Sequence, residues 1–225
     1  MVQALKEIFR GVFFDSTQRK LYVRNGVKGF RVHGETIIKE GNYHYREWNR
    51  RQSKLAAAIA KGLRSLPIKP GASVLYLGAA QGATPSFVSD IVGKNGVVYC
   101  VEFAPRAMRD LLRVCEAHEN MLPILGDARK PEEYASEIEN QKVDVLFEDV
   151  ADPQQAEILL QNARFLERGG AALIAVKSQC ISSTLPPEQS YAEFKKKVSS
   201  VFEIAEELRL DPFEEDHAFY SLRKK

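Results

Sequence analysis

Residues 75–85 read LYLGAAQGATP, a short apolar run followed by a loop of small residues that leads into a helical segment. A loop of this kind after a strand is typical of nucleotide-binding α/β folds, in which glycines let the backbone approach a pyrophosphate. Gly78 is in place, but Ala80 and Ala83 stand where the second and third glycines of a dinucleotide loop belong. With Gly78 and Gly82 alone, the loop favours a ligand that brings no pyrophosphate against the backbone.

The chain around this loop alternates between strand-like and helix-like segments from Ala72 onward. The strand-like runs are SVLYLG, GVVYCVE, MLPILGD, VDVLFEDV and AALIAVKS, and the helix-like segments are SFVSDIVGK, RAMRDLLRVCEAHE and QQAEILLQNARFLERGG. Such alternation predicts βαβ units and a parallel sheet, with ligands at the carboxyl ends of the strands. The runs VFEIAEELRL and HAFYSLR follow, separated only by DPFEED, and predict an antiparallel hairpin. This order is that of a Rossmann-like class I methyltransferase: a mostly parallel seven-stranded sheet closed by a C-terminal hairpin.

The N-terminal part has a different pattern. VFF, KLYV, GFRVHG and NYHYREW are short aromatic and β-branched runs separated by turn residues, which predict strands. Helical spacing begins at LAAAIAKGL, with Ser53 as the expected N-cap. We therefore expect a small β-rich domain over residues 1–52 and a methyltransferase domain over residues 53–225.

Composition limits the broad class. The 225 residues are 44% hydrophobic and 28% charged with a net charge of +2, as in an ordinary globular protein. No apolar run has the length of a membrane span and the N-terminus lacks the apolar core of a signal peptide, so we expect a cytoplasmic protein without a membrane partner. The three cysteines are widely spaced without nearby histidine ligands, which argues against a disulfide framework or a metal site and leaves Cys100 as a core residue.

Acidic residues end two successive strands of the predicted sheet. Glu102 ends VVYCVE, where a carboxylate can accept both ribose hydroxyls, and Asp127 follows MLPILG, where it can accept from an adenine amine. Glu102 alone fits NAD equally well, and either acid could be a solvated turn residue. The two acids in this order, after a loop without the dinucleotide glycines, favour S-adenosylmethionine as the cofactor.

The fourth and fifth strands end in Asp149 and Lys177. A lysine at the end of an apolar strand is costly to bury unless it is paired or functional. We expect Lys177 to lie opposite Asp149, near the cofactor's sulfonium with its pKa lowered, while Glu148 points to the opposite face; a purely structural ion pair is the alternative. Cytosine methylation requires a cysteine after the fourth strand, and this chain has none there. The motif of amino methylation is Asn/Asp-Pro-Pro-aromatic, which DVADP does not match. A lysine base suits a weakly acidic alcohol such as the ribose 2′-hydroxyl.

The segment from Arg46 to Arg64 has six basic residues and one acid, Glu47. Its arginines Arg46, Arg50 and Arg51 are candidate contacts to an RNA phosphate backbone. The alternative is a solvated helix face without a ligand.

Motifs along nearly the whole chain resemble the fibrillarin family. They are YREWN, SKLAAAIAKGL, VLYLGAAQGAT, VVYCVEFAPR, ILGDARKP, FEDVADPQQ, VKSQCISST and PFEEDHA. The glycine- and arginine-rich tail of eukaryotic members is missing, so the resemblance is to the archaeal form. It implies guide-RNA-directed ribose 2′-O-methylation of rRNA, and possibly tRNA, as the catalytic subunit of a C/D-box ribonucleoprotein. It also implies four partners: the guide RNA, the target RNA, a Nop-domain scaffold and a kink-turn-binding ribosomal-type protein.

The resemblance also implies roles for individual residues. The catalytic set would be Lys54, Asp149, Lys177 and His217, the last of which has little claim from the sequence alone. The cofactor contacts would be Gly78, Ala83, Thr84, Glu102, Phe103, Asp127, Ala128, Asp149, Val150, Ala151 and Asp152. Asp152 replaces the usual Gln of the family, while Gln155 is retained, and Asn49-Arg50-Arg51-Gln52 replaces a more usual Asn-Pro-aromatic-Arg.

Three other functions are compatible with parts of this pattern. A stand-alone ribose 2′-O-methyltransferase would share the two lysines and the aspartate but would need no scaffold or guide. A non-catalytic subunit would have no use for the four catalytic candidates together. Methylation of a protein glutamine, which occurs in the eukaryotic family, is a further possibility.

Overall fold

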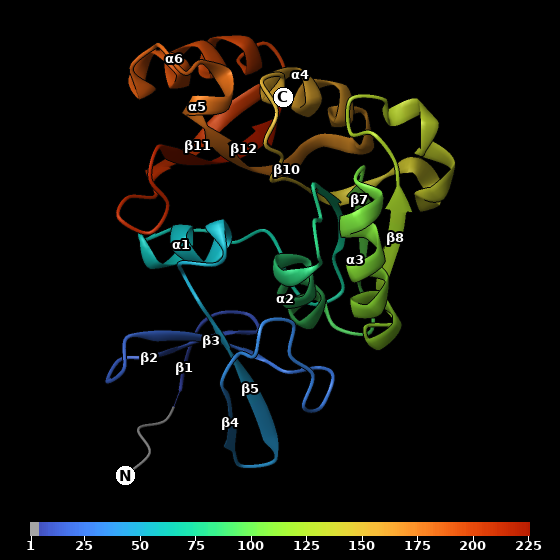
Figure 1. Cartoon of the computed structure of the whole chain (residues 1–225), viewed down its shortest axis with the longest axis vertical. Helices are drawn as coiled ribbons and strands as arrows, with labels where there is room; N and C mark the ends of the chain where they lie inside the picture. The colour runs from blue at the N-terminus through green and yellow to red at the C-terminus, as the bar shows by residue number, and fades with distance from the viewer. Residues whose placement is uncertain (1–4) are drawn as a thin grey trace.

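The computed structural model describes residues 5–225 and contains two β-sheets (Figure 1). The larger is a seven-stranded sheet in the order β11-β12-β10-β9-β6-β7-β8, in which β12 runs antiparallel to both of its neighbours, β10 and β11, and all other pairs are parallel. Its strands are β6 (Ser73–Leu77), β7 (Val97–Glu102), β8 (Met121–Leu125), β9 (Val143–Glu148), β10 (Leu166–Lys177), β11 (Phe202–Arg209) and β12 (His217–Lys224). The predicted fold class is confirmed, including the C-terminal hairpin.

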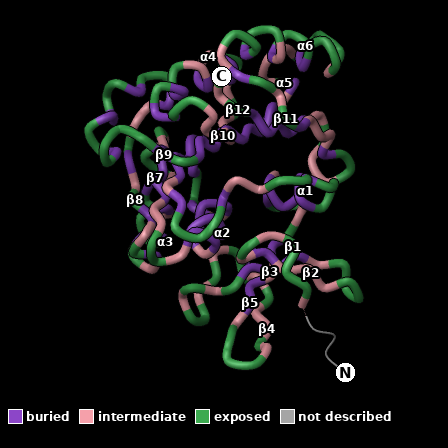
Figure 2. The backbone as a smooth tube through the Cα atoms, turned by 180° about the vertical axis from the view of Figure 1, so that it is seen from behind, coloured by how far each residue is buried: buried purple, intermediate pink, exposed green. Residues whose placement is uncertain are grey.

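Helices cover both faces of this sheet because each strand exposes apolar side chains on alternate sides. Tyr76 and Phe147 face a cluster that includes buried residues of α1 (Lys54–Ala60), α2 (Ala83–Val92) and α3 (Pro105–Ala117). Leu77 and Leu146 face a second cluster with α4 (Gln155–Asn162) and α6 (Pro187–Val198). The remaining helical segments are α5 (Ser178–Ile181), η1 (Pro131–Glu133), η2 (Ala135–Glu137), η3 (Glu139–Gln141) and η4 (Ala163–Phe165). Buried positions follow the strands and the inner helix faces, whereas the loops are exposed (Figure 2).

The N-terminal sheet is five-stranded and antiparallel, in the order β1-β2-β3-β5-β4. Its strands are β1 (Lys6–Phe9), β2 (Val12–Asp15), β3 (Lys20–Arg24), β4 (Ile37–Glu40) and β5 (Tyr43–Trp48). The predicted strand GFRVHG is wrong: Gly29 and Gly34 have φ of 78° and 74°, which break an extended run, and Phe30 and Val32 pack on the core instead. Strands β1 and β4 were not among the predicted runs.

The two sheets share one hydrophobic cluster. Val12, Val23 and Trp48 of the N-terminal sheet belong to the same cluster as helices α1 and α2. Trp48 stacks on Phe87 of α2 with ring centroids 5.1 Å apart. The expected boundary between residues 52 and 53 falls in the short connection from β5 to α1, which lies between the two sheets (Figure 1). The N-terminal sheet is therefore packed against the helix that begins at the glycine loop.

Within residues 5–225, none of the helices is both long and apolar enough to cross a bilayer.

Candidate active site

The two glycines of the loop at residues 78–82 are required for different reasons. A Cβ on Gly78 would lie 2.5 Å from the backbone oxygen of Asp149, so the loop approaches the end of β9 more closely than any side chain permits. Gly82 has φ of 85° and packs against Leu111 and Val114 of α3. Ala80 adopts φ of 47°, an uncommon value for a residue with a Cβ. Gly78 thus permits close packing against the end of β9, and Gly82 permits packing against α3. The loop adopts this conformation without a third glycine.

Glu102 holds this loop at the end of β7. Its Oε2 accepts a hydrogen bond from the Ala80 N–H at 2.8 Å, and its Oε1 accepts from the Ala104 N–H at 2.8 Å. Two backbone donors fix the carboxylate at the mouth of a cleft. The next side chain, Phe103, is 66% exposed, which is unusual for a large aromatic ring and leaves a flat apolar surface beside the carboxylate.

Asp127 lies on the other side of the cleft and is held by Arg129. The Arg129 Nη2 donates to Asp127 Oδ2 at 2.8 Å, and Arg129 Nη1 lies 3.9 Å from Asp152 Oδ2. The hydrogen bonds from Arg129 lower the pKa of Asp127, so this carboxylate is ionised near neutral pH and can accept hydrogen bonds. Asp152, which stands where the family usually has Gln, therefore pairs with Arg129. This arginine was not among the predicted site residues.

The cleft between these residues has a volume of about 300 Å³. It gathers most of the predicted cofactor contacts, namely Gly78, Glu102, Phe103, Asp127, Ala128, Asp149, Val150, Ala151 and Asp152. Ala80, Val101, Gly126, Arg129 and Ile158 also line it and were not predicted. Ala83 and Thr84 do not line this cleft; they lie beside a smaller hollow between α2 and the connection to α1.

An ion pair joins one residue of the cleft lining, Asp149, to helix α1. Lys54 Nζ, from the first turn of α1, lies 2.9 Å from Asp149 Oδ1 at the end of β9. Burial by itself lowers the pKa of Lys54, but the charge and hydrogen bond of Asp149 outweigh burial and raise it above its ordinary value. Lys54 is therefore a cation near neutral pH. Glu214 of the β11–β12 connection and Cys180 of α5 also raise the pKa of Lys54. Both segments therefore lie near this ion pair.

Hydroxyl groups connect this ion pair to the glycine loop. The Thr84 hydroxyl donates to Ser53 Oγ at 3.2 Å, and Ser53 caps α1 by accepting from the Ala56 N–H, as predicted. Tyr76, in the middle of β6, is 1% exposed. Burial and the charge of Asp149 hold its pKa well above the ordinary value, and its hydroxyl is within hydrogen-bonding range of Thr84 and Asp149. Thr84 thus links Ser53, the residue before Lys54, to the start of α2.

The structure separates Lys177 from Asp149, contrary to the pairing expected from the sequence. In the sheet Ile174 is level with Glu148, so Lys177 lies beyond the point where β9 ends. Asp149 pairs with Lys54 instead, and among residues 5–225 no acid forms an ion pair with the Lys177 amine. Lys177 is directly opposite His217 in the β10–β12 pair.

His217 is buried at the start of β12. Its Nδ1 lies 2.7 Å from the backbone oxygen of Glu215. A carbonyl oxygen can only accept, so Nδ1 carries the hydrogen and Nε2 is the nitrogen left for other contacts. The β12 strand therefore places an oriented imidazole next to Lys177.

Glu148 does not line the cleft and is fully buried. Neither of its oxygens has a hydrogen-bond partner among the described residues. Burial, followed by the charges of Asp152 and Asp149, raises the pKa of Glu148 well above its ordinary value. This carboxyl is consequently a poor counter-ion for either lysine.

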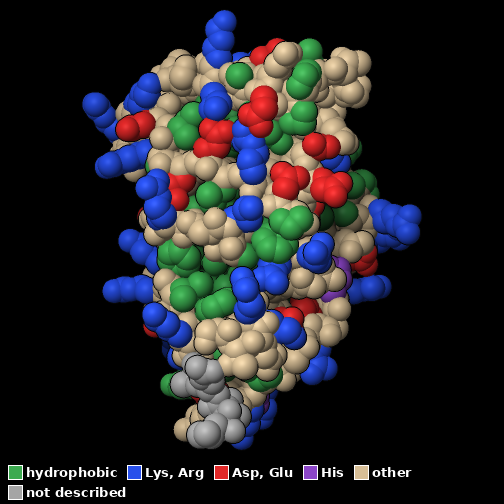
Figure 3. All heavy atoms as spheres, turned by 90° about the vertical axis from the view of Figure 1, so that its left-hand side faces the viewer, with side chains coloured by type: hydrophobic (Ala, Val, Ile, Leu, Met, Phe, Trp, Pro, Cys, Tyr) green, Lys and Arg blue, Asp and Glu red, His purple; other side chains and the backbone are tan. Residues whose placement is uncertain are grey.

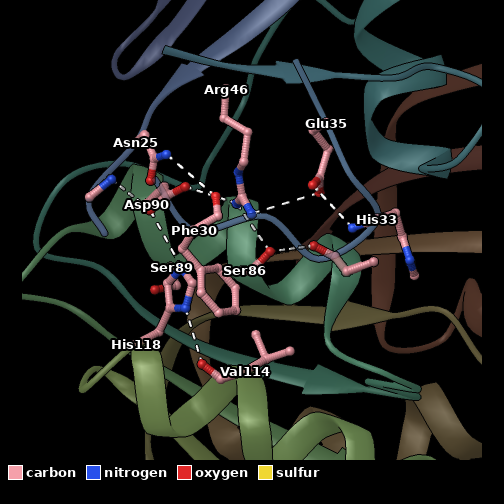
Figure 4. A network of polar contacts seen from close by, with 12 residues as sticks. Asn25, Phe30, His33, Glu35, Arg46, Ser86, Ser89, Asp90, Val114 and His118 are labelled. Carbon is pink, nitrogen blue, oxygen red and sulfur yellow. Dashed lines mark hydrogen bonds and ion pairs between the residues drawn. The ribbon is translucent and has the colours of Figure 1, made fainter. Parts of the chain in front are cut away.

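Arg46 is wrong as an RNA contact, because its side chain is 0% exposed. Figure 4 shows the guanidinium pointing from β5 into a polar network between Glu35, Ser86 and Asp90. Its Nη2 donates to Asp90 Oδ2 at 2.8 Å and to Ser86 Oγ at 3.0 Å, and its Cζ lies 3.9 Å from the centroid of the Phe87 ring. Arg46 therefore joins the N-terminal sheet to α2.

Arg50 and Arg51 reach the surface beside the β11–β12 connection. Arg50 lies over the Phe213 ring at 4.9 Å, and Arg51 Nη1 donates to the Pro212 oxygen at 3.4 Å. Lys and Arg side chains surround an apolar area on the face that includes α1 and this connection (Figure 3). Arg51 is exposed and Arg50 is partly exposed, so both stay candidates for contacts to a polyanion.

The cleft and the ion pair fit the cofactor predicted from the sequence. Glu102 and Asp127 offer fixed acceptors, Phe103 offers an exposed ring, and Asp149 offers a carboxylate to a positively charged substituent. A pyrophosphate would meet the carboxylates of Glu102, Asp127 and Asp152. The geometry therefore suits a nucleoside with a positively charged substituent better than a dinucleotide.

Comparisons with known proteins agree with this assignment. The fibrillarin family model matches residues 3–225. The chain is 50% identical over 228 residues to the fibrillarin-like rRNA/tRNA 2′-O-methyltransferase of Pyrococcus furiosus, covering 100% of both chains. It superposes with a TM-score of 0.88 and 44% identity on Aeropyrum pernix fibrillarin with natively bound S-adenosyl-L-methionine, covering 99% of this chain and 100% of that one. A fibrillarin/Nop5p complex matches with a TM-score of 0.87 and 35% identity, covering 98% and 100%.

Proposed function

The chain belongs to the fibrillarin family, and on this basis we propose that it is an S-adenosylmethionine-dependent 2′-O-methyltransferase of rRNA and tRNA. The observation that carries the proposal is the Lys54–Asp149 ion pair at a cleft suited to this cofactor, with Lys177 at the end of the neighbouring strand β10. Lys54 is held as a cation by Asp149, whereas no acid among residues 5–225 forms an ion pair with the Lys177 amine.

Each of the four catalytic candidates then has a distinct task. Lys54 pairs with one oxygen of Asp149 and holds the carboxylate in place. Asp149 faces the cleft and attracts a sulfonium. Lys177 accepts the proton of the ribose 2′-hydroxyl, and His217, on the neighbouring strand, orients that hydroxyl or the Lys177 amine through its free Nε2. When bound, S-adenosylmethionine supplies an electrophilic methyl group.

The reaction balances without another reactant. The 2′-oxygen loses its proton to Lys177 and forms a bond to the methyl carbon, while the carbon–sulfur bond breaks and its electrons remain on sulfur. Proton removal by a positioned base typically contributes about 10²–10⁴-fold. Alignment of nucleophile and methyl group contributes much of the remaining acceleration.

The RNA reaches the site over the face that includes α1 and the β11–β12 connection. Arg50 and Arg51 lie there, close to Phe213 and Pro212. With a net charge of +2, the chain has little charge to select RNA by itself. We therefore propose that specificity comes from a guide C/D-box RNA, held by a Nop-domain scaffold and a kink-turn-binding protein. The relative of known structure in complex with Nop5p supports the scaffold partner.

Methyl transfer from labelled S-adenosylmethionine tests this proposal. Single-turnover rates on a target RNA are measured for the chain alone, with scaffold and kink-turn-binding protein, and with guide RNA added. We expect transfer at the guided 2′-hydroxyl only in the complete assembly. Transfer by the chain alone would instead identify a stand-alone enzyme, and the absence of transfer in every condition would refute the catalytic assignment.

A further inference from the structure

Gln155, the first residue of α4, forms two hydrogen bonds with the backbone of Lys177. Its Nε2 donates to the Lys177 oxygen at 3.2 Å, and its Oε1 accepts from the Lys177 N–H at 3.0 Å. The Gln155 side chain is 0% exposed. A single buried amide therefore binds both backbone groups of one residue.

These backbone groups need a partner because β9 is shorter than β10. The last paired residues of the two strands are Glu148 and Ile174, so β10 continues to Lys177 without a neighbour on that side. On its other side β12 continues to His217, opposite Lys177. Leaving a buried peptide group unpaired is unfavourable. The Gln155 amide has the same donor and acceptor as a peptide group, and it substitutes for the missing strand.

The same segment of chain also lines the cleft. Residues 149–152 follow β9 along the cleft, and Asp152 Oδ1 accepts from the Gln154 N–H at 2.7 Å in a tight turn. Gln155 follows this turn as the first residue of α4, and its side chain reaches the end of β10. The cofactor-side segment and the backbone of Lys177 are thus connected through one buried side chain.

We propose that Gln155 is a positioning residue for Lys177, which sets where the amine stands relative to the substrate hydroxyl. This inference rests on the proposed function, because it requires Lys177 to act in methyl transfer. Beyond Lys177 the chain turns into α5, and the Ser178 N–H donates to the Asp216 oxygen at 3.1 Å. Without Gln155, the Lys177 backbone would be tied only to β12 and α5. Displacements of about 1 Å in a reacting group can cost on the order of 10²-fold in rate.

The test uses Gln155→Leu, which keeps the volume of the side chain and removes both hydrogen bonds. Gln161→Leu is the matched control, since Gln161 is an exposed glutamine on the same helix. In the assembled complex with guide RNA, we expect the single-turnover rate of Gln155→Leu to fall by about 10- to 10²-fold, with S-adenosylmethionine affinity within threefold of the parent. The control should retain the parental rate.

A double-mutant cycle with Lys177→Met separates positioning from a general effect on folding. If Gln155 acts through Lys177, adding Gln155→Leu to Lys177→Met lowers the rate no further. An equal fold-loss in both backgrounds, or a parallel loss of cofactor affinity, overturns the inference. Should Gln155→Leu not fold, Gln155→Asn is measured instead; its amide is one methylene too short to span both groups, and the same outcomes apply.

The cycle also distinguishes this inference from the proposed function. A parental rate in Lys177→Met would refute the catalytic role of Lys177, whatever Gln155 does. A slow Lys177→Met together with a Gln155→Leu variant as fast as the control would leave that role intact and refute only the positioning role of Gln155.

Discussion

Lys54 and Asp149 form an ion pair of 2.9 Å between the first turn of α1 and the end of β9. The pair connects the helix that follows the N-terminal sheet to the strand edge at which the cofactor cleft lies. It also determines the difference between the two lysines of the site. Because the Asp149 carboxylate is paired with Lys54, no acid within residues 5–225 forms an ion pair with Lys177, the lysine proposed to accept the proton.

Variants of Lys54 should show that its positive charge contributes to the rate of methyl transfer. Lys54→Met removes the cation, and we expect the methyl-transfer rate to fall by roughly 10²-fold, the scale for losing one preorganised electrostatic contact. Lys54→Arg keeps a cation and should retain part of this rate. Single-turnover assays in the assembled complex measure both variants. If arginine is as damaging as methionine, the charge of Lys54 is not its contribution.

Replacing Glu102 or Asp127 should weaken cofactor binding. Each substitution by Ala removes a fixed acceptor on one side of the cleft, and a lost hydrogen bond that leaves its partner unsatisfied costs about 1–3 kcal/mol, or roughly tenfold in affinity for each 1.4 kcal/mol. Titration calorimetry with S-adenosylmethionine measures the effect, and Glu132→Ala, an exposed acid outside the cleft, is the control. Parental affinity in both variants, or binding of NAD in place of S-adenosylmethionine, would contradict the cofactor assignment.

The buried and exposed arginines should behave in opposite ways. Arg46→Met leaves Asp90 buried without its strongest partner, and breaking such a pair typically costs about 3–5 kcal/mol in the free energy of unfolding. The double variant of Arg50 and Arg51 to Ala should instead preserve stability. It should lower RNA affinity in the assembled complex and reduce the log–log salt slope by about 0.7–0.9 for each phosphate that the variant no longer neutralises.

Chemical unfolding and RNA binding at several salt concentrations measure these two effects. An unchanged affinity and salt slope after removal of the Arg50 and Arg51 side chains would show that the exposed arginines are only solvated.

Glu148 should make the protein less stable as the pH rises. Its pKa is raised by burial in the folded state, so between the unfolded value of about 4.3 and the folded value the native state binds a proton that the unfolded state has released. The contribution of this group to the free energy of unfolding therefore falls with pH across that window, by up to about 1.4 kcal/mol per pH unit. Glu148→Gln removes the titration, and its stability relative to the parent should rise from pH 5 to pH 8.

Denaturant unfolding of both proteins at each pH measures this difference. A difference that stays constant with pH would show that Glu148 is ionised to the same extent in both states.

Periodicity predicted the seven-stranded sheet because each of its strands is an apolar run ending in a loop with clear turn residues. It failed in the N-terminal sheet, where β4 and GFRVHG have similar apolar content. There the positive φ of Gly29 and Gly34, which a sequence does not display, decides which run is extended. The helix α6 was not among the predicted elements, although its Pro187 and basic last turn are typical helix signals.

Site residues at the ends of strands could be predicted from the sequence. Ion pairs between residues that are distant in the sequence could not. Glu102, Asp127 and Asp149 follow strands, and they line one cleft because parallel strands end at one edge. Arg46 resembles its neighbours Arg50 and Arg51 in sequence, but β5 turns its side chain toward Asp90, a residue of α2. The pairing of Asp149 with Lys54 in place of Lys177 depends on where β9 ends relative to β10, which composition cannot specify.

The final prediction concerns Lys177, on which the mechanism depends. Lys177→Met keeps most of the apolar stem and removes the amine. If Lys177 accepts the proton of the 2′-hydroxyl, this variant should fold, bind S-adenosylmethionine and join the scaffold, while methyl transfer falls by about 10²–10⁴-fold. Asp149 should retain its place, because its ion pair is with Lys54.

Lys177→Arg distinguishes a base from a cation at the same position. A guanidinium remains protonated in proteins, so arginine can supply charge but cannot accept the proton. We therefore expect Lys177→Arg to be as slow as Lys177→Met, in contrast to the partial activity expected of Lys54→Arg. Single-turnover rates on a guided substrate compare the four variants under one set of conditions. Near-parental transfer by Lys177→Arg would show that Lys177 supplies positive charge, and proton acceptance would then have to be assigned to another group, of which His217 is the nearest across the sheet.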